Sequence, residues 1–299
     1  MRTPWTGCGT ALVSPFTRSG ELDEAAVRRL ARRQIDAGIH FLVPCGTTGE
    51  NPTLTLAERL RTVEIVVDEA GGRVPVLAGA GGNNTKEVIH LAAEMNKAGA
   101  NGLLSVTPYY NKPTPEGLFQ HYRAIAESTP LPIVVYNVPG RTGCNLEAGA
   151  LARLASIPNI VGVKEASGNL MQMCEICRAV PSDFVVLSGD DAATLPLLAI
   201  GGRGIISVAA NEIPGPMVQM VEAAERGDFA AARAIHTRIL PLMLVNFVES
   251  NPVPVKAAMA AMGLIEEIYR LPMAPARAAS RETIVKILKD LDLLNTAVA

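Results

Sequence analysis

The sequence has few of the side chains from which metal centres are built. Its four histidines are widely spaced and its five cysteines are scattered through apolar segments, which leaves little from which to assemble a zinc or iron site. Cys174 and Cys177 lie three residues apart on a predicted helix without a second pair, and we interpret them as helix-packing residues. Asp190 and Asp191 are adjacent carboxylates without further ligands nearby, and we expect them to start a helix. We therefore expect no metal. An odd number of dispersed cysteines is typical of reduced thiols and favours a cytoplasmic protein.

The sequence also lacks a basic excess and a long hydrophobic run. It has 27 Lys and Arg against 29 Asp and Glu, a net charge of −2, which argues against nucleic acid or an anionic membrane as a partner. No run approaches the roughly 18 apolar residues of a membrane span, and the N-terminus lacks the apolar core of a signal peptide. With 48% hydrophobic residues, the composition is that of an ordinary soluble globular protein.

Two glycine-rich cofactor signatures are missing as well. A dinucleotide-binding sheet would carry a glycine fingerprint after its first strand, and a phosphate loop would carry Gly-Lys-Ser or Gly-Lys-Thr. The segment 79–84 lacks the third glycine of a dinucleotide loop, and we interpret it as the end of a strand. We expect no organic cofactor.

What is present is a regular alternation of short apolar runs with segments of helical period. The apolar runs are 9–13, 39–44, 74–78, 102–107, 132–138, 160–164, 184–188 and 204–208. The helical segments are 23–37, 55–70, 85–98, 115–128, 146–156, 169–180, 191–200 and 215–226. Several apolar runs show no alternation, which suits strands covered on both faces.

Helix-capping residues agree with these segments. Thr55 and Glu58 form a capping-box pattern, and Thr85 precedes Glu87 in a similar way. Three glycines stand where helices would end: Gly38, Gly71 and Gly99.

Eight such units in a row favour the α/β class and a (β/α)8 TIM barrel over an open sheet. A chain of 299 residues could hold two average domains, but α/β barrels commonly reach this size as one. After residue 226 the pattern is helical only, with breaks at 251–254 and 271–275. We therefore predict a catalytic barrel over 1–226 and a C-terminal helical appendage over 227–299, packed on the barrel or on a neighbouring subunit.

Lys164 is the unusual lysine of this chain. Five of the seven lysines stand in polar or turn surroundings and Lys256 opens a helix-like stretch, whereas Lys164 ends an apolar run. Burying an ammonium is costly unless it is paired or gives up its proton, and a lowered pKa would make the amine a nucleophile toward carbonyls. The alternative is that Lys164 pairs with Glu165 or extends to the surface.

Other polar residues gather at the predicted carboxyl ends of the strands, where active sites of such barrels form. Hydroxyl and backbone N–H groups around Thr47 and Thr48 could hold a small carboxylate; the alternative is a simple turn. Arg141, in a Pro-Gly turn, could grip a second carboxylate, or could be a solvated loop arginine.

Three tyrosines lie at the same end, and a phenol can both donate and accept the protons that a lysine nucleophile needs moved. They are Tyr109, Tyr110 and Tyr136. Amphipathic packing would explain any one of them alone.

Four ordered motifs, with a fifth in the helical tail, resemble the dihydrodipicolinate synthase family of pyruvate-dependent class I aldolases. The motifs are GTTGE at 46–50, YNVPGRTG at 136–143, GVKEASG at 162–168, SGDD at 188–191 and NPVPVK at 251–256. The resemblance covers essentially the whole chain. The Arg-Thr-Gly ending at 141–143 points to the synthase among its relatives.

The resemblance implies an activity: condensation of pyruvate with L-aspartate 4-semialdehyde to 4-hydroxy-tetrahydrodipicolinate, on the route to diaminopimelate and lysine. It implies that Lys164 forms a Schiff base with pyruvate and that Thr48 binds the pyruvate carboxylate. Arg141 would bind the carboxylate of the semialdehyde. Gly189 and Ile206 would line the site through their backbone.

A proton relay and a quaternary structure are implied in the same way. Thr47, Tyr136 and Tyr110 would form the relay, with Tyr110 reaching into the site of the neighbouring subunit. Family members are commonly tetramers built from two tight dimers.

The resemblance also implies an allosteric cleft for lysine at the dimer interface, which Asn83, Glu87 and Tyr109 would line. The sequence departs from the lysine-sensitive pattern at four positions: Asn51, Pro52, Leu56 and Arg59. Arg59 would repel a cationic ligand. We therefore expect weak or absent inhibition by lysine.

Two alternatives stay open at this point. A sister aldolase, such as N-acetylneuraminate lyase or a 2-keto-3-deoxy sugar acid aldolase, would keep Lys164, Thr48 and Tyr136 but act on a polyol; Arg141 favours a small anionic aldehyde instead. A non-catalytic barrel would have no chemical reason to keep a nucleophile, a relay and a carboxylate grip together.

Overall fold

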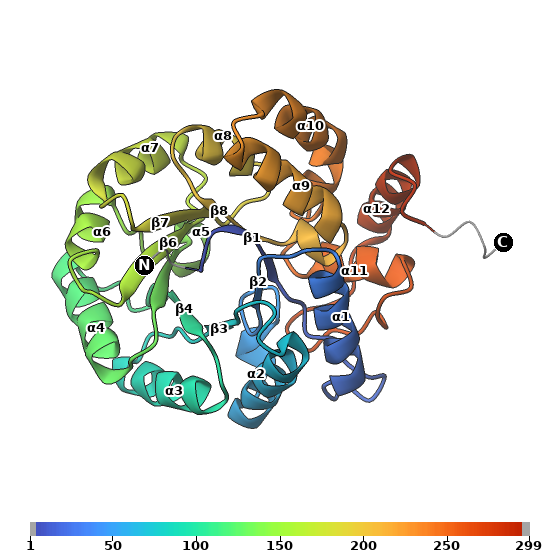
Figure 1. Ribbon diagram of the computed structural model, residues 1–299. Helices are drawn as coiled ribbons and strands as arrows, with labels where there is room; N and C mark the ends of the chain where they lie inside the picture. Colours follow the sequence, from blue (N-terminus) through green and yellow to red (C-terminus); the bar gives the residue numbers. More distant parts are fainter. Residues whose placement is uncertain (1–3, 295–299) are drawn as a thin grey trace.

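The computed structural model describes residues 4–294 and shows eight parallel strands alternating with helices (Figure 1). The strands are β1 Gly7–Ala11, β2 Phe41–Val43, β3 Leu77–Gly79, β4 Gly102–Val106, β5 Ile133–Asn137, β6 Ile160–Glu165, β7 Val185–Ser188 and β8 Gly204–Ser207. Their order is β2-β1-β8-β7-β6-β5-β4-β3, and a parallel bridge between Leu42 and Val76 joins the two ends. The predicted (β/α)8 barrel is confirmed.

Helices surround the barrel and then continue beyond it. Those of the strand–helix units are α1 Glu24–Asp36, α2 Leu56–Ala70, α3 Thr85–Lys97, α4 Pro115–Ser128, α6 Ala148–Leu154, α7 Leu170–Ala179, α8 Thr194–Ala199 and α9 Pro214–Glu225. A short helix, α5 Pro139–Thr142, and two 3-10 turns, Asn51–Thr53 and Ala209–Asn211, lie in the loops. The C-terminal helices are α10 Phe229–Val245, α11 Val253–Ala261 and α12 Ala278–Asp290, and Figure 1 shows them on one side of the barrel, beyond α1 and α9.

Alternation along each strand divides the core into an inner and an outer layer. Phe41, Leu104, Val134 and Leu187 belong to one buried cluster with Trp5. Neighbouring strand residues belong to other clusters that include helix residues; they are Leu42, Leu103, Val135, Val163 and Val186. Side chains facing the barrel axis therefore fill its interior.

Glycines make room for the largest inner side chains. A Cβ on Gly9 would lie 2.1 Å from the Phe41 ring, and one on Gly102 would lie 2.5 Å from the Trp5 ring. The two rings meet edge to face with centroids 5.8 Å apart. The end of the barrel opposite the strand carboxyl ends is thus closed by packing.

Helix ends follow the predicted caps with one correction. Thr55 and Glu58 form the complete capping box of α2, and Gly71 ends that helix in the left-handed conformation at φ +53°. The N-cap of α3 is Asn84, whose side chain accepts from Lys86 N, and not Thr85. Asparagine is as good a cap as threonine, so the sequence pattern placed this helix start one residue late.

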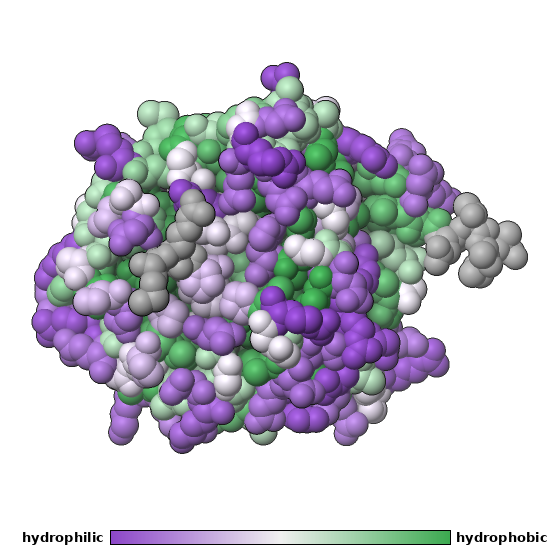
Figure 2. Space-filling view, in the orientation of Figure 1, coloured by the Kyte–Doolittle hydropathy of each residue, from purple (hydrophilic) through white to green (hydrophobic). Residues whose placement is uncertain are grey.

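The face of the molecule seen in Figure 2 is mixed in hydropathy. Hydrophilic side chains cover most of the periphery of the face seen in Figure 2, with smaller hydrophobic areas between them. Within residues 4–294, none of the helices has the length and hydropathy that a membrane crossing requires.

Candidate active site

Lys164 points into the carboxyl end of the barrel. Val163 packs against the helix-side core, so the next residue on β6 faces inward. Tyr136 on β5 is the register partner of Lys164 and belongs to the inner cluster. The Lys164 side chain is 5% exposed, and its Nζ lies 4.4 Å from the centroid of the Tyr136 ring.

Glu165 does not neutralise this lysine. It is fully buried on the opposite side of β6, where its carboxylate accepts from Asn137 Nδ2 at 2.8 Å and from Ser167 N at 2.7 Å. Its backbone carbonyl accepts from Gly189 N at 2.8 Å. The geometry therefore disfavours a Lys164–Glu165 pair, and Glu165 instead fixes the end of the strand that carries Lys164.

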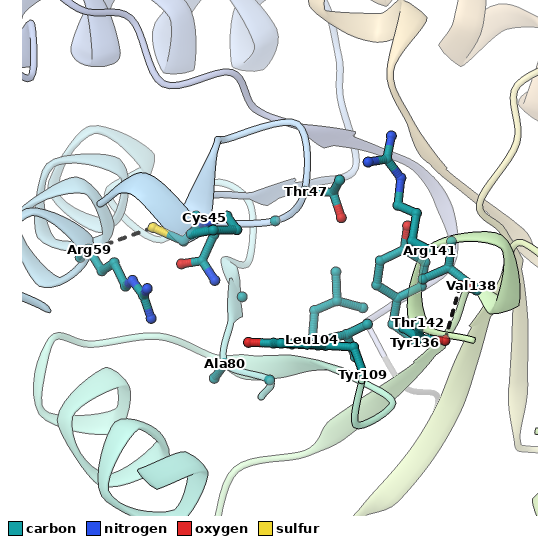
Figure 3. A pocket seen from close by; sticks show the side chains of 16 residues that line it. Cys45, Thr47, Arg59, Ala80, Leu104, Tyr109, Tyr136, Val138, Arg141 and Thr142 are labelled. Atoms are coloured by element: carbon teal, nitrogen blue, oxygen red, sulfur yellow. Dashed lines mark hydrogen bonds between the residues drawn. The ribbon is translucent and has the colours of Figure 1, made fainter. Parts of the chain in front are cut away.

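A cavity of about 280 Å³ opens at the same end of the barrel. Its lining includes Thr47, Tyr136 and Arg141, three of the residues singled out from the sequence. Figure 3 shows Tyr136 and Arg141 on one side of this cavity, with Thr47 of the β2 loop close to them. Lys164 is not part of the lining but lies beside it, against the Tyr136 ring.

The loop after β2 is tightly turned. Gly49 N donates to Gly46 O and Glu50 N donates to Thr47 O, both at 3.1 Å, and Glu50 has a left-handed φ of +50°. A Cβ on Gly79 would lie only 2.0 Å from Cys45 O, so the glycine in β3 is what allows this close approach.

Thr48 and Arg141 both meet Asn251. The buried Thr48 hydroxyl accepts from Asn251 Nδ2 at 3.0 Å, and Arg141 Nη2 donates to Asn251 O at 3.2 Å. Arg141 lies in the short helix α5 and not in an open turn. Asn251 was not singled out from the sequence except as part of a motif, because the pattern there indicated only a helix break.

A buried ion pair anchors the end of the β2 loop. Lys256 Nζ lies 2.5 Å from Glu50 Oε1, with both side chains inaccessible, and it donates to Ser14 O at 3.1 Å. Burial lowers the pKa of Lys256, and the neighbouring Glu50 carboxylate opposes that shift. Thus two lysines are buried, Lys164 and Lys256, whereas the sequence drew attention to Lys164 alone. The apolar run before Lys256 was the available signal.

The remaining predicted residues occupy different places. Gly189 packs on the lysine, since a Cβ there would lie 3.1 Å from Lys164 Cε. Ile206 is fully buried in the inner cluster. Tyr110 is 90% exposed with a left-handed φ of +73°, so the structure holds it outside the cavity of its own chain.

Of the three residues expected to line the allosteric cleft, Tyr109 borders the same cavity. Tyr109, Arg59, Asn51 and Pro52 line it, and Figure 3 shows Arg59 entering from the side opposite Tyr136 and Arg141. Asn83 Nδ2 donates to Tyr109 O at 3.2 Å.

Two more expected residues have local roles. The Glu87 carboxylate accepts from Asn84 at the start of α3. Leu56 is 41% exposed at the start of α2.

Asp191 holds the ends of β7 and β8 together and does not start a helix, as α8 begins at Thr194. Its buried carboxylate accepts from Ser207 Oγ at 2.5 Å, Val208 N at 3.1 Å and Ala209 N at 3.2 Å. Burial raises the pKa of Asp191 to about 6, and these hydrogen bonds oppose the shift.

Comparison with known proteins places this geometry in a family. The model of the dihydrodipicolinate synthetase family matches residues 4–291. The chain belongs to the dihydrodipicolinate synthetase family. The 4-hydroxy-tetrahydrodipicolinate synthase of Koribacter versatilis is 53% identical over 292 residues, covering 97% of each chain. That of Nitratidesulfovibrio vulgaris is 52% identical over 283 residues, covering 94% of this chain and 97% of the relative.

Solved structures of the family agree with the fold. Dihydrodipicolinate synthase from Thermotoga maritima is 45% identical with a TM-score of 0.96, covering 98% of this chain and 100% of that one. A monomeric dihydrodipicolinate synthase variant is 45% identical with a TM-score of 0.96, covering 97% and 98%.

Proposed function

We propose that the chain condenses pyruvate with L-aspartate 4-semialdehyde to give 4-hydroxy-tetrahydrodipicolinate, in the biosynthesis of diaminopimelate and lysine. The observation that carries this proposal is the buried amine of Lys164 against the Tyr136 ring, beside a cavity lined by Thr47 and Arg141. Membership of the family and relatives of about half identity that carry this activity in their names support the same reaction.

The first half of the reaction uses Lys164. The neutral amine attacks the keto carbon of pyruvate, and loss of one water gives the imine. The pyruvate carboxylate is bound by Thr48 and the backbone of the β2 loop. Thr47, Tyr136 and the Tyr110 of a neighbouring subunit carry protons to and from the carbinolamine oxygen.

The second half joins the aldehyde. Removing a proton from the methyl group of the imine gives an enamine, whose carbon attacks the aldehyde carbon of the semialdehyde. Arg141 holds the carboxylate of this second substrate, and Gly189 and Ile206 border the site. The amino group of the semialdehyde then attacks the imine carbon, closes the ring and releases Lys164. No cofactor enters this scheme.

A polyol-processing aldolase is the competing activity. Arg141, at the rim of the cavity, favours an anionic aldehyde, and the named relatives agree. Steady-state turnover of pyruvate with the semialdehyde should therefore exceed turnover with sugar-derived aldehydes by orders of magnitude. Faster turnover of a sugar aldehyde would contradict the proposed substrate.

Arg141→Ala tests, within the same assay, whether Arg141 binds the carboxylate of the semialdehyde. The substitution should raise the KM for the semialdehyde while leaving formation of the pyruvate adduct nearly intact, because only the second substrate uses this guanidinium. Equal losses in both steps would show that Arg141 has another role. Arg141→Lys is the matched control, because it keeps the charge and loses the bidentate geometry. Its KM for the semialdehyde should lie between those of the wild type and Arg141→Ala.

We propose a homotetramer in the cytoplasm, built from two dimers in which Tyr110 crosses to the neighbouring subunit. The 90% exposure of Tyr110 suits such a crossing, and so does the exposure of apolar side chains on α7 and after α10: Leu170, Met171, Phe247 and Val248. The five cysteines, all free, suit a reducing compartment.

We also propose that lysine inhibits this protein weakly or not at all. The guanidinium of Arg59 occupies the side of the cavity next to Tyr109, where it repels a cationic ligand. Sub-millimolar lysine should leave the steady-state rate unchanged; inhibition in that range would contradict the proposal. Arg59→Leu removes the charge together with the hydrogen bond from Arg59 Nε to Leu54 O, and it should increase inhibition by lysine if the charge is what repels this ligand.

A further inference from the structure

Asn251 contacts both residues that are proposed to bind the substrate carboxylates, Thr48 and Arg141. Its side-chain amide donates to the Thr48 hydroxyl at 3.0 Å, and its main-chain carbonyl accepts from Arg141 at 3.2 Å. These partners lie 203 and 110 residues away in the sequence. One residue from the C-terminal helical region therefore contacts both groups.

The direction of the hydrogen bond to Thr48 has a chemical consequence. A threonine hydroxyl carries one proton and accepts through its lone pairs, whereas an amide NH₂ group only donates. Because Thr48 Oγ1 accepts from Asn251, the proton of that hydroxyl is left for another acceptor. A carboxylate is such an acceptor, and a hydrogen bond to an ionised group is stronger than one between neutral groups.

The position of Asn251 is fixed from the side of α11. Asn251 is 4% exposed, and Val253 N donates to Ser250 O across it at 2.9 Å. The carbonyl of Val253 accepts from the Tyr269 hydroxyl at 3.0 Å. Three residues further on, Lys256 reaches Glu50, which is two residues from Thr48. The helix start and the β2 loop are thus joined at two places.

The amide of Asn251 also has a cost that packing does not explain. Within the described residues its buried Oδ1 has no hydrogen-bond partner, and an unsatisfied buried acceptor destabilises a fold. An apolar side chain at this position would avoid that cost. The feature of the amide that an apolar side chain lacks is the hydrogen bond from its NH₂ group to the Thr48 hydroxyl.

We propose that Asn251 is a positioning residue: its amide sets the Thr48 hydroxyl to donate to the pyruvate carboxylate, and its carbonyl holds Arg141 for the second carboxylate. This inference rests on the proposed function, because it takes the roles of Thr48 and Arg141 from it. It assigns to the C-terminal helical region a part in substrate binding that acts through Thr48 and Arg141.

Asn251→Asp is the decisive variant because it reverses the hydrogen bond. An ionised carboxylate only accepts, so the Thr48 hydroxyl would donate to Asp and turn away from the substrate. The KM for pyruvate should rise by about 10-fold to 100-fold, the range expected for a lost hydrogen bond to a charged group. The KM for the semialdehyde should change less, because the main-chain carbonyl that holds Arg141 is retained.

Asn101→Asp is the matched control for the added charge. Asn101 is exposed at the start of β4, where its Oδ1 accepts from Val76 N at 2.8 Å, a bond that aspartate keeps. This variant should retain the wild-type KM for both substrates. If Asn101→Asp raised the pyruvate KM as much as Asn251→Asp, the effect would come from net charge and the proposal would be overturned.

A double-mutant cycle shows whether Asn251 acts through Thr48. In a Thr48→Val background, Asn251→Ala should add little to the rise in pyruvate KM, since the hydroxyl that it positions is gone. Additive effects would overturn the positioning role. This cycle also decides the matter if Asn251→Asp fails to fold, because alanine introduces no charge.

The adduct separates the failure of this inference from failure of the proposed function. Wild-type protein that forms no pyruvate adduct on Lys164 would overturn both. Wild-type protein that forms the adduct, together with an Asn251→Asp variant of unchanged pyruvate KM, would overturn only the role of Asn251.

Discussion

At the scale of single residues, Lys164 reaches the rim of the barrel because position 189 has no side chain. A Cβ on Gly189 would lie 2.6 Å from Ala166 Cβ and 3.1 Å from Lys164 Cε. The first contact is shorter than real Cβ contacts, so the end of β6 would have to move. Displacing a nucleophile by about 1 Å can slow a reaction by about 100-fold.

Gly189→Ala should therefore reduce kcat/KM by about 100-fold while the barrel still folds. Gly149→Ala is the control: Gly149 lies in α6 and has nothing within 4 Å of an added Cβ, so activity should be unchanged and stability should rise by about 0.5–1 kcal/mol. Measuring steady-state kinetics and thermal unfolding of both variants checks this. A fully active Gly189→Ala would show that the space beside Lys164 is not needed.

At the residue scale, the sequence predicted the burial of Lys164 but not that of Lys256; the catalytic role of Lys164 stays a prediction. Lys164 ends an apolar run on a strand, a local pattern that can be read directly. Lys256 is buried only because Glu50, 206 residues away, meets it across the interface between α11 and the β2 loop. The apolar run before Lys256 is a weak local signal, but the partner itself cannot be read from the sequence around Lys256, because a pairing between distant segments leaves no local pattern. The same holds for Asn251 and its partners Thr48 and Arg141.

At the scale of elements, the strand–helix order was predictable and the loops were not. The predicted strands overlap all eight observed ones, because strands covered on both faces are apolar throughout. The loops depend on hydrogen bonds that local patterns do not encode. Arg141 donates to Asn251 O, and Asp191 ties the end of β7 to β8.

Asp191 should make stability depend on pH in a specific direction. Its folded-state pKa is raised to about 6, so between pH 4 and 6 the folded state binds the proton more tightly than the unfolded state. Stability from this group is therefore present at low pH and is lost as the pH rises through 6. The rise of the Asp191 pKa from 3.8 to about 6 corresponds to a loss of about 3 kcal/mol in the free energy of unfolding.

Asp191→Asn isolates this effect, because asparagine does not titrate. The free energy of unfolding of the wild type, minus that of the variant, should decrease as the pH rises from 4 to 7 in urea titrations. Other titrating groups contribute equally to the free energies of unfolding of the wild type and the variant, so their contributions cancel when one is subtracted from the other. A difference that is independent of pH, or that increases with pH, would contradict the assignment.

At the scale of the whole molecule, the C-terminal helices share a core with the barrel. Leu242 of α10, Ala257 of α11 and Leu288 of α12 belong to the same buried cluster as Leu42 of β2. The division into a barrel over 1–226 and a helical region over 227–299 stays a prediction, and its outermost residues, 1–3 and 295–299, lie outside the described part of the chain.

The assembly predicts that two inactive variants restore each other. If Tyr110 acts in the neighbouring site, a dimer of one Lys164→Ala and one Tyr110→Phe subunit contains one intact site. Random mixing of the two variants should then recover about a quarter of the wild-type activity per subunit. Dissociating and reassociating the mixture, followed by an activity assay, provides the measurement. Lack of recovery in mixed dimers would place Tyr110 in its own subunit's site.

The most direct test of the whole account is reductive trapping of the pyruvate adduct. Borohydride reduction in the presence of pyruvate, followed by peptide mapping by mass spectrometry, should find the reduced adduct on Lys164. It should be absent from Lys256, although that lysine is also buried, because Glu50 holds it away from the cavity. Lys164→Arg should give no adduct. An adduct on Lys256, or none in the wild type, would contradict the account.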